Sequence, residues 1–195
     1  MLVLVGIPSG DMVHAEFAMC LSNMMVRTAS EPGYMVALFN AKGCNIDRNH
    51  YYMAKKAVEL GADRLLIIGT DMTFPAETLV SLAEAGKDVI ACNAAKRTPP
   101  HKGVAFDDDG KPLSMKKGRE IVEVGHIGSG IMMIDTKVFG VIPEPWFRSA
   151  YIGDGNFDSC DYNFCRFVKA AGFGLYCHRR LSKMVGHIGT TTHML

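Results

Sequence analysis

The segment Arg64–Pro75 constrains the fold most, because an unbroken apolar run, Leu65–Ile68, ends there in Gly-Thr-Asp71. A strand buried on both faces reads as a continuous apolar run, and open α/β sheets bind ligands just beyond the carboxyl ends of such strands. The segment therefore predicts a central strand with Asp71 at the functional edge of a sheet. On position alone, Asp71 suits two roles equally: it could hold a divalent cation, or it could cap a helix that begins near Pro75.

Apolar runs of this kind recur along the chain and alternate with amphipathic segments. Strand-like runs at about 1–7, 34–39, 64–69, 88–92, 130–135 and 174–178 alternate with helix-like segments at about 12–26, 48–60, 76–85 and 160–171. This alternation predicts an α/β, Rossmann-like fold with a mostly parallel sheet flanked by helices. With 195 residues, 48% of them hydrophobic, the chain is long enough for one well-filled core. We therefore expect residues 1–195 to form a single domain.

The segment 98–125 departs from this alternation. It holds Thr98-Pro-Pro100, the acidic turn Asp107–Gly110 and the basic run Lys116–Arg119 between short apolar pieces. Residues 106–113 suit a hairpin, and the rest suits an excursion over the sheet edge, where substrate contacts often lie. A solvated loop is the alternative for most of its charges.

Composition restricts the partners and the compartment. A formal net charge of +1 provides no global field to attract nucleic acid or an acidic membrane, so an anion must be bound locally. The six cysteines include no Cys-x-x-Cys pair, which indicates reduced thiols. The apolar start Met1–Pro8 is too short for a membrane anchor and has no basic flank. We expect a cytoplasmic protein without a membrane span.

Asp161 is the second candidate for chemistry. A helix that starts near Ser159 would place Asp161 on the same face as three apolar residues, Phe164, Cys165 and Val168. A carboxylate that points inward beside N-terminal amides stays ionised in a fixed direction, which suits a general base acting on an alcohol. The competing interpretation is a capping box, with Asp158 as the cap and Asp161 three residues later.

Three further positions have both a functional and a structural interpretation. His187 could complete an octahedral Mn²⁺ site with Asp71 and a diphosphate, or it could be a structural histidine. Arg48-Asn49 begins a helix with Asp47 as a plausible cap, and offers a guanidinium to a phosphate or remains a surface arginine. Trp146 could stack on a sugar or anchor the core.

The glycine-rich run Gly125–Gly130 precedes a strand, whereas a dinucleotide-binding fingerprint follows a strand and opens a helix. This order disfavours hydride transfer. What the glycines do allow is close approach of the backbone to a ligand.

Short motifs follow one another along the chain: Pro8-Ser9 after the first strand, Arg48-Asn49, Ile68–Pro75 with Asp71, Ala94–Arg97, Gly128-Ser-Gly130, Pro145-Trp-Phe147, Cys160-Asp161 before Phe164-Cys165, and His187-Ile-Gly189. Together they resemble the type-A glycosyltransferase fold, in particular the small bacterial and phage proteins of the inverting family-two type. The likeness spans nearly the whole chain.

The resemblance implies a metal-dependent glycosyltransferase that moves a sugar, with inversion, from a nucleotide-diphosphate donor to an acceptor hydroxyl. Asp71 and His187 would ligate Mn²⁺ or Mg²⁺, and Asp161 would be the catalytic base. The residues that would bind the donor or border the acceptor are Pro8, Ser9, Arg48, Asn49, Asp71, Lys96, Arg97, Gly128, Ser129, Gly130 and Trp146.

Two positions depart from the pattern of this family. Gly69 stands where the first Asp of the Asp-x-Asp motif is usual, and Cys160 stands where an acidic residue usually precedes the base. Either change could alter the choice of donor or mark a decayed enzyme. One alternative function is therefore a non-catalytic module of the same fold that binds a nucleotide sugar or a glycan.

A nucleotidyltransferase is a further alternative, but it normally carries a basic, glycine-rich loop after the first strand, and Gly6–Asp11 has no basic residue. The acceptor stays open among a glycan, a lipid-linked sugar, a protein and a modified DNA base. For nucleic acid, a local basic edge could form from Lys102, Lys116, Lys117 and Arg119.

Overall fold

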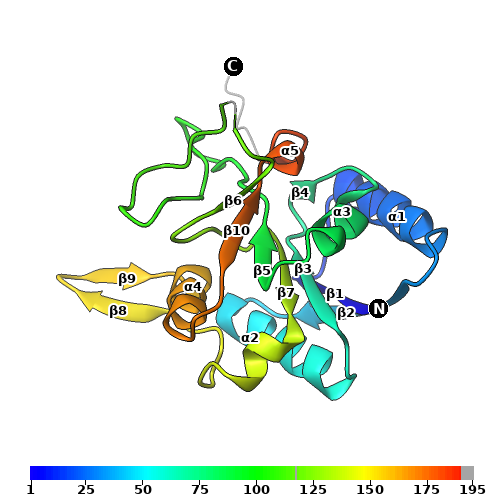
Figure 1. Ribbon diagram of the computed structural model, residues 1–195, viewed down its shortest axis with the longest axis horizontal. Coiled ribbons are helices and arrows are strands. Elements are labelled where there is room, and N and C mark those ends of the chain that lie inside the picture. The colour runs from blue at the N-terminus through cyan, green and yellow to red at the C-terminus, as the bar shows by residue number, and fades with distance from the viewer. Residues whose placement is uncertain (117, 190–195) are drawn as a thin grey trace.

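The computed structural model describes residues 1–116 and 118–189 (Figure 1). The helices are α1 (Ala15–Ala29), α2 (Ile46–Glu59), α3 (Thr78–Glu84), the 3-10 helix η1 (Thr136–Gly140), α4 (Cys160–Ala170) and α5 (Arg179–Ser182). The strands are β1 (Leu2–Ser9), β2 (Met35–Lys42), β3 (Arg64–Ile68), β4 (Met72–Thr73), β5 (Val89–Ala91), β6 (Ile121–Glu123), β7 (Ile131–Asp135), β8 (Ala150–Gly153), β9 (Asn156–Asp158), β10 (Leu175–His178) and β11 (Gly186–His187). The six strands and four helices expected from the sequence are all present, with small shifts of their ends.

Seven strands form the central sheet in the order β2-β1-β3-β7-β5-β10-β6. The sheet is mixed. Strands β1, β2, β3, β5 and β10 run in one direction, whereas β7 is antiparallel to both of its neighbours and β6 is antiparallel to β10. Because β7 runs the opposite way, its first residue, Ile131, pairs with the last residue of β3, Ile68. The start of β7 therefore lies at the edge where the parallel strands end.

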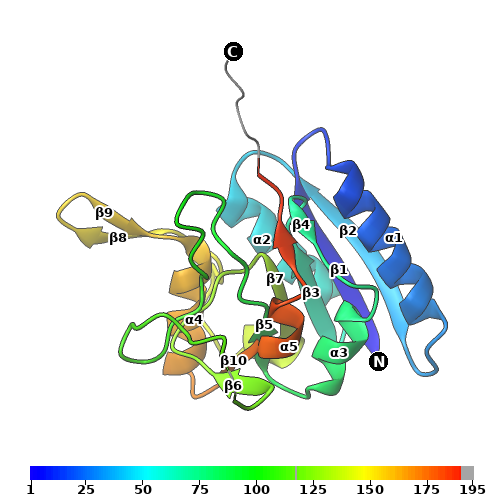
Figure 2. The same ribbon diagram turned by 90° about the horizontal axis from the view of Figure 1, so that it is seen from above.

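Helices cover both faces of the sheet, and each face has its own apolar core (Figure 2). On β3, Leu65 and Ile67 belong to the core under α2, α4 and η1, whereas Leu66 and Ile68 belong to the core under α1 and α3. Successive side chains of a strand point to opposite faces, so a strand with two covered faces needs apolar residues at every position. This explains the unbroken apolar run in the sequence.

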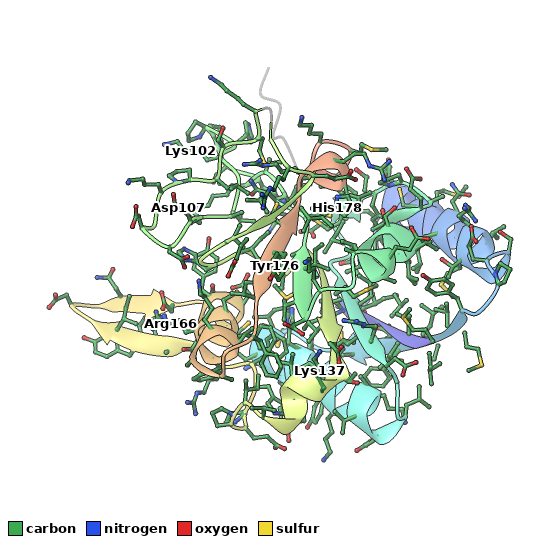
Figure 3. The ribbon with its side chains drawn as sticks, viewed as in Figure 1. Lys102, Asp107, Lys137, Arg166, Tyr176 and His178 are labelled. Atoms are coloured by element: carbon green, nitrogen blue, oxygen red, sulfur yellow. The ribbon has the colours of Figure 1, made fainter. Side chains whose placement is uncertain are left out.

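The segment between β5 and β7 is the excursion expected from the sequence. Phe106 pairs with Pro112 around a tight turn at Asp107–Gly110, which confirms the hairpin. Lys102 and Asp107 mark this excursion in Figure 3. The sequence did not indicate strand β6 or the β8–β9 hairpin. That hairpin projects from the body beside α4 (Figures 1 and 2) and exposes Tyr151 and Phe157.

Three expectations about helix caps are wrong. The cap of α2 is Asn45, whose side chain accepts from the Arg48 N–H at 2.9 Å, while Asp47 accepts from Ser149. Asp71 does not cap α3, because that helix begins at Thr78 after Glu77. Asp158 is not the cap of α4: Ser159 occupies that position, and Asp158 pairs with Arg166.

All six cysteines lie in the described residues and are free thiols. Four of them, Cys92, Cys160, Cys165 and Cys177, are buried, as expected of reduced core residues. Among the described helices, none combines the length and the apolar character needed to cross a bilayer.

Candidate active site

Asp71 and His187 meet at the carboxyl edge of the sheet. Antiparallel pairing of β4 with β11 sets His187 opposite Met72, directly beside Asp71, and the Ile188 N–H donates to the Asp71 carbonyl at 2.7 Å. His187 Nε2 lies 3.1 Å from Asp71 Oδ2, and both side chains are about one-quarter exposed. Two residues far apart in sequence are thus brought together as the sequence predicts.

The second ring nitrogen of His187 defines how the ring can bind a cation. Nδ1 lies 2.7 Å from the Ala95 carbonyl oxygen, to which it must donate. In the neutral ring Nε2 then carries a lone pair beside the Asp71 carboxylate. A histidine that ligates a metal usually donates its other N–H to a backbone carbonyl in this way.

The spacing of this pair also fits a divalent cation. Octahedral Mg²⁺ has ligands at about 2.1 Å, so two adjacent ligand atoms are about 3 Å apart; Nε2 and Oδ2 are 3.1 Å apart. The described residues contain no group of three or more His, Cys, Asp and Glu side chains that could hold a metal. Asp71 and His187 would therefore supply two ligands, and phosphate and water oxygens would supply the others. The Arg97 guanidinium lies 3.4 Å from the same Asp71 oxygen.

Gly69 and Gly130 join the Asp71 region to the start of β7. The Gly69 N–H donates to the Gly130 carbonyl at 2.9 Å. A Cβ at Gly69 would lie 3.0 Å from Asp71 Oδ1, so a carboxylate at position 69 would stand directly beside that of Asp71. The chain thus holds the single carboxylate of Asp71 at this point.

Asp161 lies at the first turn of α4 and is held against the start of β7. Its Oδ2 accepts from the Ser129 N–H at 3.1 Å, and its Oδ1 accepts from the Tyr162 N–H at 3.0 Å and from the Ser159 hydroxyl. A Cβ at Gly128 would lie 2.9 Å from Val104 Cγ2, so glycine is needed for this close approach. The run Gly128–Gly130 therefore contacts Asp161 at one end and Gly69 at the other.

His50 is a residue of this site that the sequence reasoning missed. Its Nδ1 lies 2.9 Å from the Ile46 carbonyl, and its Nε2 lies 3.1 Å from the Ser129 hydroxyl. Nδ1 must donate to the carbonyl, so the neutral Nε2 accepts from Ser129. Burial lowers the pKa of His50 below its usual 6.5, which keeps the ring neutral near pH 7.

A signal for His50 was present in the sequence. On the buried face of α2, His50 and its neighbour Asn49 are polar, whereas Met53, Ala54 and Ala57 are apolar. Buried polar side chains are costly unless they are hydrogen-bonded, so polar residues on an apolar helix face indicate a site.

Asn49 and Ser9 define the other end of the site. The Asn49 Nδ2 donates to the Gly43 carbonyl at 2.8 Å, and the Gly43 N–H donates to the Ser9 carbonyl at 2.9 Å. The Asn49 Oδ1 is buried and has no hydrogen-bond partner among the described residues. A Cβ at Gly43 would lie 2.6 Å from the Arg48 guanidinium. The exposed Arg48 side chain therefore lies against Gly43, which is bonded to the last residue of β1. Pro8 precedes that last residue and is half-buried.

The remaining expected residues are placed differently. Trp146 is only 5% exposed and packs against Tyr51 and Phe139, with ring centroids at 5.4 and 5.0 Å. Of its two interpretations, the structure supports the core anchor. Lys96 is exposed in the segment after β5 that also carries Arg97. Cys160, next to Asp161, is buried, and burial raises the pKa of its thiol, so this position adds no charge beside Asp161.

With these features the protein has the type-A glycosyltransferase fold: a seven-stranded mixed sheet flanked by helices. A197 from STIV matches over 100% of this chain and 98% of that chain, with a TM-score of 0.60 and 14% identity. GalNAc-T7, solved with UDP, GalNAc and Mn²⁺, matches over 99% of this chain and 45% of its own, with a TM-score of 0.61 and 12% identity.

The catalytic domain of Drosophila beta1,4galactosyltransferase 7, solved in complex with xylobiose, matches over 100% of this chain and 76% of its own, with a TM-score of 0.56 and 12% identity. No family model matches the sequence, and no curated protein does. At these identities the structural likeness defines the fold alone.

Proposed function

We propose that this protein is a metal-dependent glycosyltransferase that moves a sugar from a nucleotide-diphosphate donor to an acceptor hydroxyl with inversion. The observation that carries the proposal is the run Gly128–Gly130, which contacts Asp161 at one end and Gly69, beside Asp71, at the other. A carboxylate for a cation and a carboxylate for a proton are thereby held on the two sides of one backbone segment.

Asp71 and His187 would hold Mn²⁺ or Mg²⁺, and the cation would neutralise the charge that develops on the leaving diphosphate. The Asn49 Oδ1, buried and unpaired among the described residues, is an acceptor for a hydroxyl or N–H of the nucleotide. Arg48 and Arg97 add positive charge on either side of the phosphates. GalNAc-T7, which shares the fold, was solved with a nucleotide, a sugar and Mn²⁺.

Asp161 would act as the base in the transfer. Its carboxylate takes the proton of the acceptor hydroxyl while the hydroxyl oxygen attacks the anomeric carbon of the donor. The bond from that carbon to the phosphate oxygen breaks, and its electron pair leaves with the nucleoside diphosphate. Ser129 fixes Asp161 through its N–H, and His50 holds the Ser129 hydroxyl, so the base keeps one direction.

A thermal-shift panel of UDP, GDP, CDP, ADP and dTDP, each with and without Mn²⁺, tests the donor site. We expect one diphosphate to raise the melting temperature only when Mn²⁺ is present, and Asp71→Asn to abolish that rise. Asp63→Asn, at the opposite edge of the sheet where Asp63 accepts from the Leu2 N–H, is the matched control. Absence of stabilisation by every diphosphate in the wild type would contradict the proposal.

The second candidate is a non-catalytic module of the same fold that binds a nucleotide sugar or a glycan. Gly69 and Cys160 favour it, because each removes a carboxylate from the site. Diphosphate binding that depends on Mn²⁺ and Asp71, without release of sugar from any sugar nucleotide, would identify this module.

We also propose a domain organisation and a cellular compartment for the protein. We take residues 1–195 as one glycosyltransferase-like domain. We place the protein in the cytoplasm, because its six cysteines are free and four of them are buried.

A further inference from the structure

A small basic cavity lies at the β10–β6 end of the sheet. It has a volume of about 210 Å³ and lies between the segment before β6 and helix α5. Its lining includes five cationic side chains and one carboxylate: Lys116, Arg119, Arg179, Arg180, Lys183 and Glu120. The chain as a whole carries a net charge of only +1. The cavity is therefore far more positive than the chain as a whole.

The only carboxylate that lines the cavity is already engaged. Glu120 Oε1 accepts from Arg180 Nε at 2.8 Å. Among the described residues, the other four cations of the cavity form no salt bridge, and the buried Arg179 Nε has no hydrogen-bond partner. Cations gathered around a cavity without their own counter-ions repel one another, and a bound anion relieves that repulsion.

The cavity lies at the same edge of the sheet as the candidate active site. His178, the last residue of β10, pairs with Ile121, the first residue of β6, so the flanking segments lie at the carboxyl edge (Figure 1). Asp71 lies at that edge after β3, three to four strands away in the sheet order. With neighbouring strands about 4.8 Å apart, the cavity is about 15–20 Å along the edge from Asp71.

Further cations belong to the segment that follows β5, which lies between β3 and β10 in the sheet. The Arg97 guanidinium lies 3.4 Å from the Asp71 carboxylate. The neighbouring Lys96 N–H donates to the Lys102 carbonyl at 2.9 Å, which holds Lys96 and Lys102 side by side. Lys96 and Lys102 are exposed, and Figure 3 shows Lys102 on this excursion. Positive charge thus recurs between the active site and the cavity.

We propose that the cavity binds a backbone phosphate of a nucleic-acid strand, which lies along the carboxyl edge and presents a hydroxyl-bearing nucleotide to Asp161 as the acceptor. The inference rests on the proposed function for the transfer itself. A polymer with a phosphate at every nucleotide matches cations repeated along about 15–20 Å, whereas one free phosphate would occupy the cavity alone.

The surroundings favour a nucleic acid over a lipid-linked acceptor. Acyl chains or an isoprenoid need exposed apolar side chains next to the phosphate site. Of the large apolar residues that are exposed in the described part of the chain, only Met184 belongs to the segments 95–103, 116–120 and 179–185. These three segments therefore offer positive charge with a single large exposed apolar side chain.

The test is binding of a fluorescent single-stranded oligonucleotide of about 12 nucleotides, measured by anisotropy over a series of salt concentrations. We expect binding at about 50 mM salt that weakens steeply as salt rises. The double variant Lys116→Glu/Lys183→Glu should bind at least about tenfold more weakly, and its salt slope should fall by about 0.7, because the cavity supplies one single-strand phosphate contact and each such contact contributes about 0.7.

The matched control is Lys55→Glu/Lys56→Glu, which makes the same change of net charge on exposed residues of α2. This control should bind within about twofold of the wild type. Equal loss in both double variants, or no binding of the oligonucleotide at low salt, would overturn the proposal. So would binding to anionic phosphatidylglycerol vesicles without binding to the oligonucleotide.

Each double variant is also melted with the stabilising diphosphate and Mn²⁺. An unchanged diphosphate shift in Lys116→Glu/Lys183→Glu shows that the variant is folded and that its donor site is intact. Loss of oligonucleotide binding then concerns the cavity alone. Failure of the wild type to bind any diphosphate is a separate result, which concerns the proposed transfer.

Discussion

The two parts of the candidate site that we propose bind the nucleotide and the acceptor are built from different stretches of the chain. On the proposed nucleotide side, Ser9, Gly43 and Asn49 are joined by hydrogen bonds within residues 9–49. On the proposed acceptor side, Ser129 bonds both His50 and Asp161, so this side joins α2, the segment before β7 and α4. The first side needs only β1, β2 and α2, whereas the second also requires β7 and α4 to be in place. We therefore expect substitutions on the two sides to separate donor binding from transfer.

His50 connects the two sides. It belongs to α2 next to Asn49, yet its Nε2 accepts from the hydroxyl of Ser129, whose N–H donates to Asp161. Its ring also lies against Phe147, with centroids 5.0 Å apart. A change at this position should affect the acceptor side while the donor side stays intact.

The largest expected effect separates the two sides completely. Asp161→Asn keeps the shape of the side chain but cannot take a proton, so transfer should fall by about 10²–10⁴-fold. The diphosphate shift with Mn²⁺ should not change. Transfer is measured by turnover assays with the sugar nucleotide that corresponds to the stabilising diphosphate. Diphosphate binding is measured by thermal shift. Asp154→Asn, an exposed carboxylate at the turn of β8–β9, is the control; transfer by Asp161→Asn at the wild-type rate would refute the role of the base.

A smaller effect is expected where the two sides join. His50→Leu replaces the imidazole with an apolar side chain of similar size. The Ser129 hydroxyl then loses its acceptor, so Asp161 should be held less firmly. We expect kcat to fall by about tenfold while diphosphate binding persists. His14→Leu, at the start of α1, is the control. If kcat and diphosphate binding fell together, His50 would have a general structural role instead.

The pH dependence of stability gives a third test. Burial lowers the pKa values of His50, His126 and His178 below 6.5, so the unfolded chain binds more protons than the folded chain on acidification. Stability from these groups is complete above pH 6.5 and decreases as the pH falls below it toward the lowered pKa values. Thermal melts from pH 8 to pH 5 should show this decrease. The decrease should be shallower in His50→Leu, and an equal slope in both proteins would contradict the assignment.

The smallest effect on transfer is expected at Trp146. Trp146→Phe removes part of a core side chain between Tyr51 and Phe139, and should cost about 1–2 kcal/mol of stability through incomplete packing. Turnover at a temperature where the variant is folded should stay within about twofold. A large fall in kcat with unchanged melting temperature would instead place the indole against the acceptor. Chemical denaturation and turnover assays decide between these results.

The sequence predicted most of the regular elements. Buried strands appear in it as continuous apolar runs, and helices appear as segments in which apolar residues recur with the helical period. It also placed Asp71 just beyond the end of a central strand and Asp161 near the start of a helix, and both positions are confirmed. It did not indicate that β7 runs antiparallel, because a connection as long as 92–130 is compatible with either direction. The short strands β6 and β11 have too few residues for a period, and the contact of His50 with Ser129 depends on tertiary packing.

The reversed direction of β7 has a consequence for how a protein of this kind can change. Residues 92–130 leave the carboxyl edge after β5 and return to the same edge at β7, so this segment is a cassette with both ends anchored at one place. Apart from β6, which pairs with β10 at the end of the sheet, it can be lengthened, shortened or exchanged without altering the register of the other strands. Its last residues, Gly128–Gly130, contact Asp161, and it also contains Lys96, Lys102 and Arg119. If the proposed roles hold, exchange of this one segment would alter the choice of acceptor and leave the proposed nucleotide side unchanged.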